Sequence, residues 1–92
     1  MITSFGDKRT ERLFRDAVVR EFHGVARRAK RKLEALHAAA RLEDLRLPPS
    51  NRLEKLRGDL AEYHSIRINE KWRIVFKWID NNAQEVAICD YH

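Results

Sequence analysis

Between Ser65 and Trp78, apolar and polar residues alternate on both sides of a short polar break at positions 69–71. Alternation with a period of two is typical of a strand that has one buried and one exposed face. Two such runs around a short break predict a β-hairpin. Because a shift of one residue turns a strand over, the length of the loop decides which side chains are buried. This hairpin therefore constrains the fold more than any other stretch of the chain.

A three-residue loop at positions 69–71 gathers the apolar side chains of the hairpin on a single face. A two-residue loop would instead set Arg67 against Trp72 and mix apolar and charged residues. The three-residue loop places Arg67 directly opposite Arg73 on the other face, with Ser65 opposite Val75. On the apolar face it pairs Ile68 with Trp72, Ile66 with Ile74, and His64 with Phe76.

The predicted pairing of Arg67 with Arg73 needs an explanation. Two arginines that face each other across a ladder repel, at a cost of a few tenths to about 1 kcal/mol. Folding does not require such a pair, whereas a site for an anion would use it. A charged face in contact with solvent is an equal alternative, because surface arginines are common.

The composition indicates one small globular domain, which we take as residues 1–92, with 43% of its residues apolar. The single cysteine, Cys89, excludes an internal disulfide and fits a reducing cytosol. We interpret Cys89 as a small buried hydrophobe rather than a nucleophile. No stretch is long and apolar enough for a signal peptide or a membrane span, so a cytoplasmic protein without a membrane partner is expected.

The net charge of +5 lies in the first half of the chain. Residues 8–46 hold twelve Lys or Arg against six Asp or Glu, whereas the remainder holds seven against eight. Concentrated positive charge points to a polyanion or an acidic partner. The densest run lies at the start of a predicted helix, where anions would be favoured. A binding surface and a solvated face both explain this run, which comprises Arg27, Arg28, Lys30, Arg31 and Lys32.

The first half of the chain is predicted to be mostly helical. Ile2–Phe5 is long enough for one short strand, and Asp7 is a suitable N-cap for a helix that begins at about Lys8. Gly24 separates this helix from a second one over roughly residues 25–45. The apolar stripe of the second helix consists of Val25, Ala29, Leu33, Leu36 and Ala40.

The second half of the chain is predicted to form the sheet. Residues 47–50 end the helical half because they contain two prolines, and residues 51–59 are expected to form a loop or a single turn. Strands follow over roughly residues 63–68, 72–78 and 85–90. The order β-α-α-β-β-β predicts an α+β fold, with two N-terminal helices packed on one face of a small, mostly antiparallel sheet. Arg67 and Arg73 then project from the open face.

Several groups that can converge on this open face suit the cleavage of a phosphodiester. Arginine binds phosphate through two parallel hydrogen bonds and stabilises charge that develops on it. Histidine and a carboxylate can transfer protons near neutral pH. Such a set can cleave RNA without a metal or another cofactor, and the sequence has no zinc-site spacing. A frayed, polar C-terminus is the alternative. The candidate residues are Arg57, Arg67, Arg73, Asp90, Tyr91 and His92.

Four stretches of the sequence, in order, resemble the HigB family of toxins in the RelE/ParE superfamily. They are F-G-D-K-x-T-E-x-L-F from Phe5, R-L-E-x-L-x-G-D from Arg52, Y-x-S-I-R-I-N-x-x-W-R-I-x-F from Tyr63, and the closing D-Y-H. The resemblance implies a RelE-like fold and a ribosome-dependent endoribonuclease that cuts messenger RNA in the ribosomal A site. It also implies a HigA-type helix-turn-helix antitoxin as partner, through which the complex contacts operator DNA.

The resemblance also implies roles for individual residues. Arg73 matches the phosphate-stabilising arginine of the family, and the closing residues 90–92 match its acid–base and substrate-orienting end, with either Asp90 or His92 as the base. Arg57 matches a basic position, and Arg67 is common in one branch of the family. Glu54 departs from the pattern, since some members carry histidine there. The basic run of the second helix would dock on ribosomal RNA.

Two other functions are compatible with the same fold. A ParE-like protein would bind DNA gyrase and cleave nothing, and a non-toxic module would only bind an antitoxin. The pair of Arg67 and Arg73, together with the D-Y-H end, favours the nuclease, because a gyrase binder needs no converging acid–base set.

Overall fold

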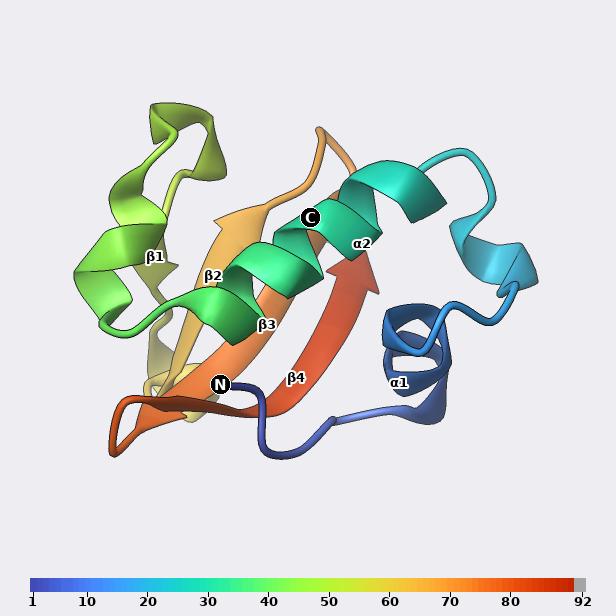
Figure 1. Cartoon of the computed structure of the whole chain (residues 1–92). Helices are drawn as coiled ribbons and strands as arrows, with labels where there is room; N and C mark the ends of the chain where they lie inside the picture. Colours follow the sequence, from blue (N-terminus) through green and yellow to red (C-terminus); the bar gives the residue numbers. More distant parts are fainter. Residues whose placement is uncertain (91–92) are drawn as a thin grey trace.

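A computed structural model of the chain describes residues 1–90 (Figure 1). Four strands form one antiparallel sheet in the order β1-β2-β3-β4. The prediction of an α+β fold with two helices and an antiparallel sheet is confirmed. The helices are α1 (Lys8–Phe14) and α2 (Ala26–Ala38), the strands are β1 (Glu54–Lys55), β2 (Tyr63–Arg67), β3 (Trp72–Ile79) and β4 (Asn82–Asp90), and short 3-10 turns lie at Arg20–Phe22, Leu42–Arg46, Pro49–Asn51 and Gly58–Leu60.

The predicted element order is wrong at two places. Ile2–Phe5 does not form a strand but touches β4 through two isolated parallel bridges, at Ala83 and Val86. Gly6 then lies so close to β4 that a Cβ on it would meet the carbonyl oxygen of Glu85 at 2.9 Å. The strand that completes the sheet is instead β1, which lies within the segment predicted to be a loop. It is only two residues long and exists because it pairs with β2, which no local pattern encodes.

The start of α1 agrees with the prediction. The Asp7 carboxylate accepts a hydrogen bond from the backbone N–H of Thr10 at 2.7 Å, as an N-cap should. Thr10 is fully buried, and its hydroxyl accepts from the backbone N–H of Ile88 at 2.9 Å. The first turn of α1 is therefore fixed against β4.

Helix α2 is shorter than predicted. It ends at Ala38, because Ala39 has an extended backbone and the Asp44 carboxylate accepts hydrogen bonds from the next two backbone N–H groups. The chain then folds back so that Leu45, in a 3-10 turn, is buried. Within the predicted apolar stripe Ala29, Leu33 and Leu36 are buried, Val25 packs at the margin of the core, and Ala40 is exposed.

The register predicted for the hairpin is confirmed. Arg67 lies opposite Arg73, and the backbone N–H of Ile68 donates to the carbonyl of Trp72 at 2.9 Å. The loop is closed by the side chain of Asn69, whose Oδ1 accepts from the backbone N–H groups of Lys71 and Trp72 at 2.9 and 2.8 Å. Asparagine in such a turn replaces a backbone acceptor, which explains a loop of three residues.

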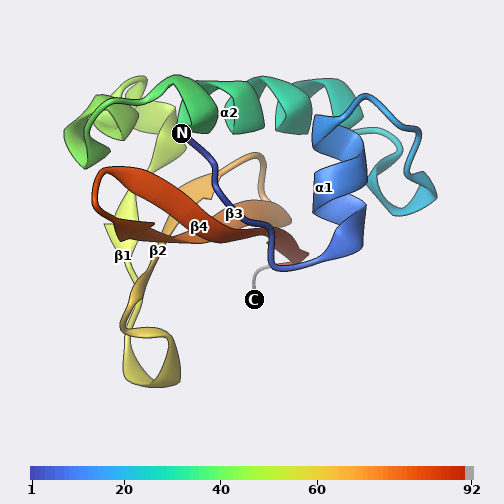
Figure 2. The same cartoon turned by 60° about the horizontal axis from the view of Figure 1, so that its bottom comes forward.

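The two faces of the sheet have different surroundings. Figure 2 shows α2 lying across one face, while the segment between β1 and β2 extends past the sheet on the other side. The face toward α2 carries the core, in which the side chains of Phe22, Leu33, Leu36, Ile66, Ile74, Phe76, Val86 and Ile88 are fully buried. We call the other face the open face. None of the helices within residues 1–90 is long and apolar enough to cross a membrane.

Candidate functional site

Arg73 is the central charged residue of the open face. Strand alternation turns it away from the core, yet the whole residue is only 7% exposed. Its Nη2 donates to the backbone carbonyl of Arg52 at 3.0 Å and lies 3.3 Å from the carboxylate of Glu54. These two contacts hold the guanidinium in one orientation, and its fork can bind a phosphate or stabilise a developing negative charge.

Arg67 lies directly opposite Arg73, as predicted. Its Nε donates to the backbone carbonyl of Asn69 at 3.1 Å, so the side chain is fixed beside the hairpin loop. A hollow of about 260 Å³ is lined by Arg52, Arg67, Asn69, Glu70 and Arg73. The structure thus brings the two predicted arginines together on one concave surface, which we call the arginine hollow.

Arg57 and Asp90 line a second hollow on the open face, of about 530 Å³. Its lining is largely apolar and includes Val75, Ala87 and Cys89. Cys89 is the residue opposite Arg73 on β4, so the second hollow adjoins the position of Arg73. The Asp90 carboxylate lies 3.9 Å from the ammonium of Lys71. The four described members of the predicted set are therefore spread over two neighbouring hollows rather than one.

Cys89 is half-buried rather than fully buried as predicted. Burial, and to a smaller extent the charge of Asp7, raises the pKa of the Cys89 thiol above its usual value, while Arg9 acts in the opposite direction. A raised pKa keeps the thiol protonated at neutral pH and makes it a poor nucleophile. The side chain contributes apolar surface to the second hollow instead.

Two predicted site residues, Tyr91 and His92, lie outside the described residues. Asp90, the last described residue, ends β4 and lines the second hollow of the open face. Their roles stay predictions. Among residues 1–90, no group of three or more His, Cys, Asp or Glu side chains is placed to hold a metal ion.

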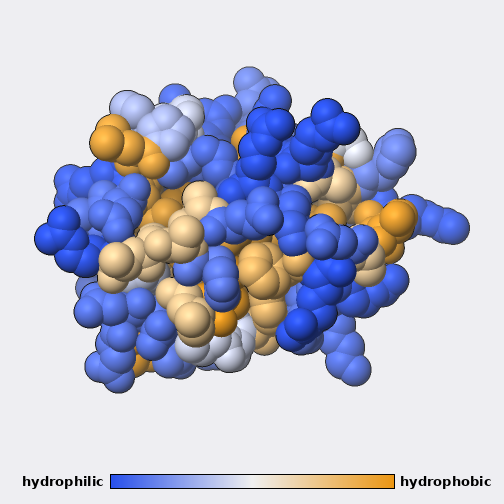
Figure 3. Space-filling view, in the orientation of Figure 1, coloured by the Kyte–Doolittle hydropathy of each residue, from blue (hydrophilic) through white to orange (hydrophobic). Residues whose placement is uncertain are grey.

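Four of the five basic residues of α2 share one surface. Arg27, Arg28 and Arg31 line a hollow of about 440 Å³ with Asn69, and Arg28, Arg31 and Lys32 line an adjoining hollow of about 510 Å³ that reaches Arg67. Figure 3 shows strongly hydrophilic side chains gathered at this edge of the molecule, above α2. We call the two hollows together the basic groove.

Lys30 does not line this surface, and its predicted part in RNA binding stays a prediction. Its ammonium lies 3.1 Å from the carboxylate of Asp16, contacts the backbone carbonyl of Phe14 and lies 4.7 Å from the centre of the Phe14 ring. Lys30 thus joins α2 to the end of α1. Helical periodicity is the reason, because neighbouring positions on a helix point in directions about 100° apart.

Lys32 lies inside the basic groove and is partly buried. Its ammonium donates to the side-chain oxygen of Asn51, and burial together with the positive charge of Arg28 lowers its pKa below the usual value. An anion in the groove would act in the opposite direction, because a nearby negative charge favours the charged form of lysine.

Three residues of the site were not identified from the sequence. Arg52 and Asn69 line the arginine hollow, and Glu54 contacts Arg73. The motif from Arg52 contained two of them, but their proximity to Arg73 follows from the pairing of β1 with β2. Asn69 was assigned only to the loop.

Comparison with known proteins places these features in a family. A family profile described as the RelE-like toxin of the type II toxin–antitoxin system HigB matches residues 3–92. Endoribonuclease HigB of Proteus vulgaris is 32% identical over 96 residues, and the alignment covers 100% of both chains. Toxin HigB-1 of Vibrio cholerae is 51% identical over 53 residues, which are 58% of this chain and 56% of the relative. The chain thus spans little more than half the length of this second relative.

Solved structures share the fold at low sequence identity. A mutant of YafQ from Escherichia coli superposes with a TM-score of 0.68 at 14% identity, over 98% of this chain and 93% of the other. A chain of the YoeB–YefM complex from Staphylococcus aureus gives a TM-score of 0.62 at 19% identity, over 100% and 98%. These likenesses show that the chain shares the overall fold of the two proteins.

Proposed function

The chain belongs to the HigB family of RelE-like toxins of type II toxin–antitoxin systems, and on this basis we propose that it is an endoribonuclease that cuts messenger RNA in the ribosomal A site. The observation that carries the proposal is Arg73, a buried arginine on the open face with a second arginine directly opposite. The relative from Proteus vulgaris, which aligns over the whole chain, is named an endoribonuclease.

The proposed reaction is an attack within the RNA strand. A base takes the proton of a ribose 2′-hydroxyl, and the 2′-oxygen forms a bond to the neighbouring phosphorus. The bond from phosphorus to the 5′-oxygen of the next nucleotide breaks, and an acid protonates that oxygen. The products are a 2′,3′-cyclic phosphate and a 5′-hydroxyl end. Negative charge rises on the phosphate oxygens in the transition state, where a fixed cation is most effective.

Each predicted residue has a role in this reaction. Arg73, held by Glu54, stabilises the charge on the phosphate, and Arg67 binds the same strand at the arginine hollow. Asp90 and His92 carry out the two proton transfers. Arg57, in the second hollow, adds positive charge beside Asp90, and Tyr91 orients the substrate.

The basic groove gives the toxin a surface for RNA. Arg27, Arg28, Arg31 and Lys32 lie along one side of α2, and RNA is a polyanion whose phosphates such side chains neutralise. The reaction takes place in the cytoplasm, where messenger RNA is translated.

As a toxin of a type II system, the protein works with a cognate antitoxin. We expect a HigA-type helix-turn-helix protein, and we expect it to supply the contacts of the complex with operator DNA. The Staphylococcus aureus relative was solved as a toxin–antitoxin complex.

The proposal is tested by adding the purified protein to a translating system and mapping the 5′ ends of the messenger RNA. We expect cuts within codons that disappear when ribosomes are omitted. The His92→Ala variant should bind the antitoxin but leave the messenger RNA intact, because it lacks a proton-transfer group. Uncut messenger RNA, together with blocked DNA supercoiling by gyrase, would replace this proposal with a ParE-like activity.

A further inference from the structure

The basic groove and the arginine hollow adjoin each other around the edge of the hairpin. The two hollows of the basic groove share Arg28, Arg31 and Asn69. The larger of them shares Arg67, Asn69 and Glu70 with the arginine hollow. One continuous depression therefore runs from Gly24, before α2, to Arg73 on the open face.

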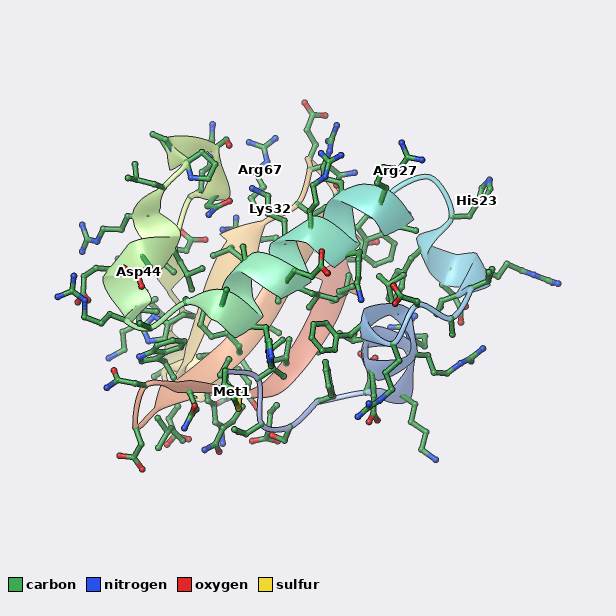
Figure 4. All side chains as sticks on the ribbon, in the orientation of Figure 1. Met1, His23, Arg27, Lys32, Asp44 and Arg67 are labelled. Atoms are coloured by element: carbon green, nitrogen blue, oxygen red, sulfur yellow. The ribbon has the colours of Figure 1, made fainter. Side chains whose placement is uncertain are left out.

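Arg67 lies where the two parts of this depression meet. Only its Nε is occupied within the described chain, by the carbonyl of Asn69, and its two Nη groups have no acceptor among residues 1–90. Figure 4 shows Arg67 and Lys32 close together at the edge where β2 meets α2, with Arg27 farther along on the same side. The guanidinium of Arg67 can therefore reach a ligand from either part.

Apart from Arg73, which contacts Glu54, most cations of this depression have no carboxylate partner in the part of the chain that the structure describes. Across residues 1–90, no carboxylate lies within 4.0 Å of the cationic groups of Arg27, Arg28, Arg31, Lys32 or Arg67. Some cations elsewhere are paired, as Arg15 is with Glu11 and Lys77 with Glu85, but exposed ones such as Arg12 are in none of the ion pairs within residues 1–90. The lining of the three hollows contains one acidic residue, Glu70.

The arrangement on α2 is unfavourable for the isolated protein. Arg27 and Arg31, and likewise Arg28 and Lys32, are four residues apart on the helix, and each pair of like charges costs about 0.2–0.5 kcal/mol. The lowered pKa of Lys32 reflects the same repulsion in addition to burial. A ligand with several negative charges in a row would remove this cost.

We propose that the depression binds one strand of RNA along its length, so that the strand cut at Arg73 continues past Arg67 into the basic groove beside α2. This inference rests on the proposed function only in taking Arg73 as the site of the reacting phosphate. It assigns Arg67, Arg28, Arg31 and Lys32 to the sugar-phosphate backbone of the substrate itself. Proteins that bind single strands commonly do so with a basic groove that follows the backbone.

A single strand suits this surface better than a double helix. A duplex is recognised across its wide minor groove by contacts spread over many base pairs, which suits an extended surface. The depression here bends at the hairpin loop, where Asn69 lines all three hollows, and turns from the α2 side of the sheet to the open face. A flexible strand can follow that turn.

The test measures binding of labelled 2′-O-methyl RNA strands by fluorescence anisotropy without ribosomes. These strands lack the attacking hydroxyl, so binding is separated from cleavage. For strands of up to about ten nucleotides, affinity should rise with length until the depression is filled. The double variant Arg28→Gln/Arg31→Gln should lose this gain in affinity with length. The plot of the logarithm of the association constant against the logarithm of salt concentration should become less steep by about 1.4, since each single-strand phosphate contact contributes about 0.7 to the steepness.

A matched control removes the same charge elsewhere. Arg12 and Arg20 are exposed and line none of the three hollows, so Arg12→Gln/Arg20→Gln should keep the wild-type slope and length dependence. Equal losses in the two double variants would overturn the inference, because they would show attraction by net charge alone.

Two further outcomes would also overturn it: a preference for duplex RNA of equal length, and affinity that does not rise with strand length. Failure of the proposed nuclease is distinguishable, since it would appear as uncut messenger RNA in the translating system while binding of the strands persists. The single variant Arg67→Gln should lower the salt slope by about 0.7 and shorten the length over which affinity rises.

Discussion

The two faces of the sheet are built from the same strands, but the side chains buried on them are of different kinds. On the face toward α2, Ile66, Ile74 and Phe76 are fully buried among other apolar side chains. On the open face Ser65 is fully buried as well, and Arg73 nearly so. Burial by itself therefore does not distinguish the two faces.

The partners of the buried groups do distinguish the faces. Thr10, the buried polar residue of α1, accepts a hydrogen bond from β4, whereas the Ser65 hydroxyl has no hydrogen-bond partner within residues 1–90. Arg73 is buried beside a carboxylate, and a buried ion pair is often no more stable than apolar residues in its place. The open face thus retains polar groups that folding does not favour, which is typical of a surface kept for binding or chemistry.

The largest effect is expected on the face toward α2. Replacing Phe76 by alanine should lower the free energy of unfolding by about 3–5 kcal/mol, because a fully buried ring is removed and a cavity is left. Urea denaturation followed by circular dichroism measures this. Ile79→Ala, at a residue that is 42% exposed, serves as the control and should stay within about 0.5 kcal/mol. A loss below that of the control would contradict our assignment of the core.

Arg73→Ala is expected to separate function from stability. The rate of messenger RNA cleavage should fall about 10²–10³-fold, as when one donor to a developing negative charge is removed. The free energy of unfolding should fall by only about 1–3 kcal/mol, since the groups left without a partner include the half-exposed Glu54. Cleavage rates in the translating system and urea midpoints are measured on the same preparations.

The variant Arg73→Lys sharpens this prediction. It retains the charge but not the planar fork, and it should therefore remain well below the wild-type rate. If Arg73→Ala cleaved at the wild-type rate while stability fell, the open face would be structural at this position.

The smallest expected effect on stability concerns His64, which lies on the face toward α2. Its ring stacks against that of Phe76, with 5.9 Å between the ring centres. Burial, and in second place the charge of Lys55, lowers the pKa of His64 below its usual value. The unfolded chain therefore binds a proton more readily. The contribution of neutral His64 to the free energy of unfolding is fully present above the ordinary histidine pKa of about 6.5. It is lost as the pH falls through that value toward the lowered pKa of the folded state.

Urea midpoints of the wild type and of His64→Gln between pH 7.5 and 5.5 provide the measurement. The wild type should lose stability over this range, and the variant should lose less. Parallel slopes in the two proteins would show that the protonation of His64 does not contribute.

Features that depend on neighbouring residues could be predicted from the sequence. The register of the hairpin follows from strand alternation and from Asn69, whose side chain closes the loop within three residues. The N-cap at Asp7 and the break at Gly24, where φ is +95°, are local in the same way. The opposition of Arg67 and Arg73, the feature that first suggested an anion site, belongs to this class.

Features that depend on distant packing could not be predicted. The end of α2 at Ala38 follows from the turn at Asp44, which buries Leu45, although helical periodicity alone allowed a longer helix. Helical periodicity turns Lys30 away from its basic neighbours, but its pairing with Asp16 at the end of α1 required the position of that helix. Neither the early end of α2 nor this pairing is encoded by a pattern of adjacent residues.

By itself, the sequence determined the α+β class, the antiparallel hairpin and the pair of arginines on one face, because alternation and turn chemistry act over a few residues. Only the tertiary structure decided that Glu54 and the Arg52 carbonyl hold Arg73, and that the basic groove continues to it past Arg67. The physical reason is that these contacts join segments far apart in the chain, and their positions are fixed by how the sheet and α2 pack together.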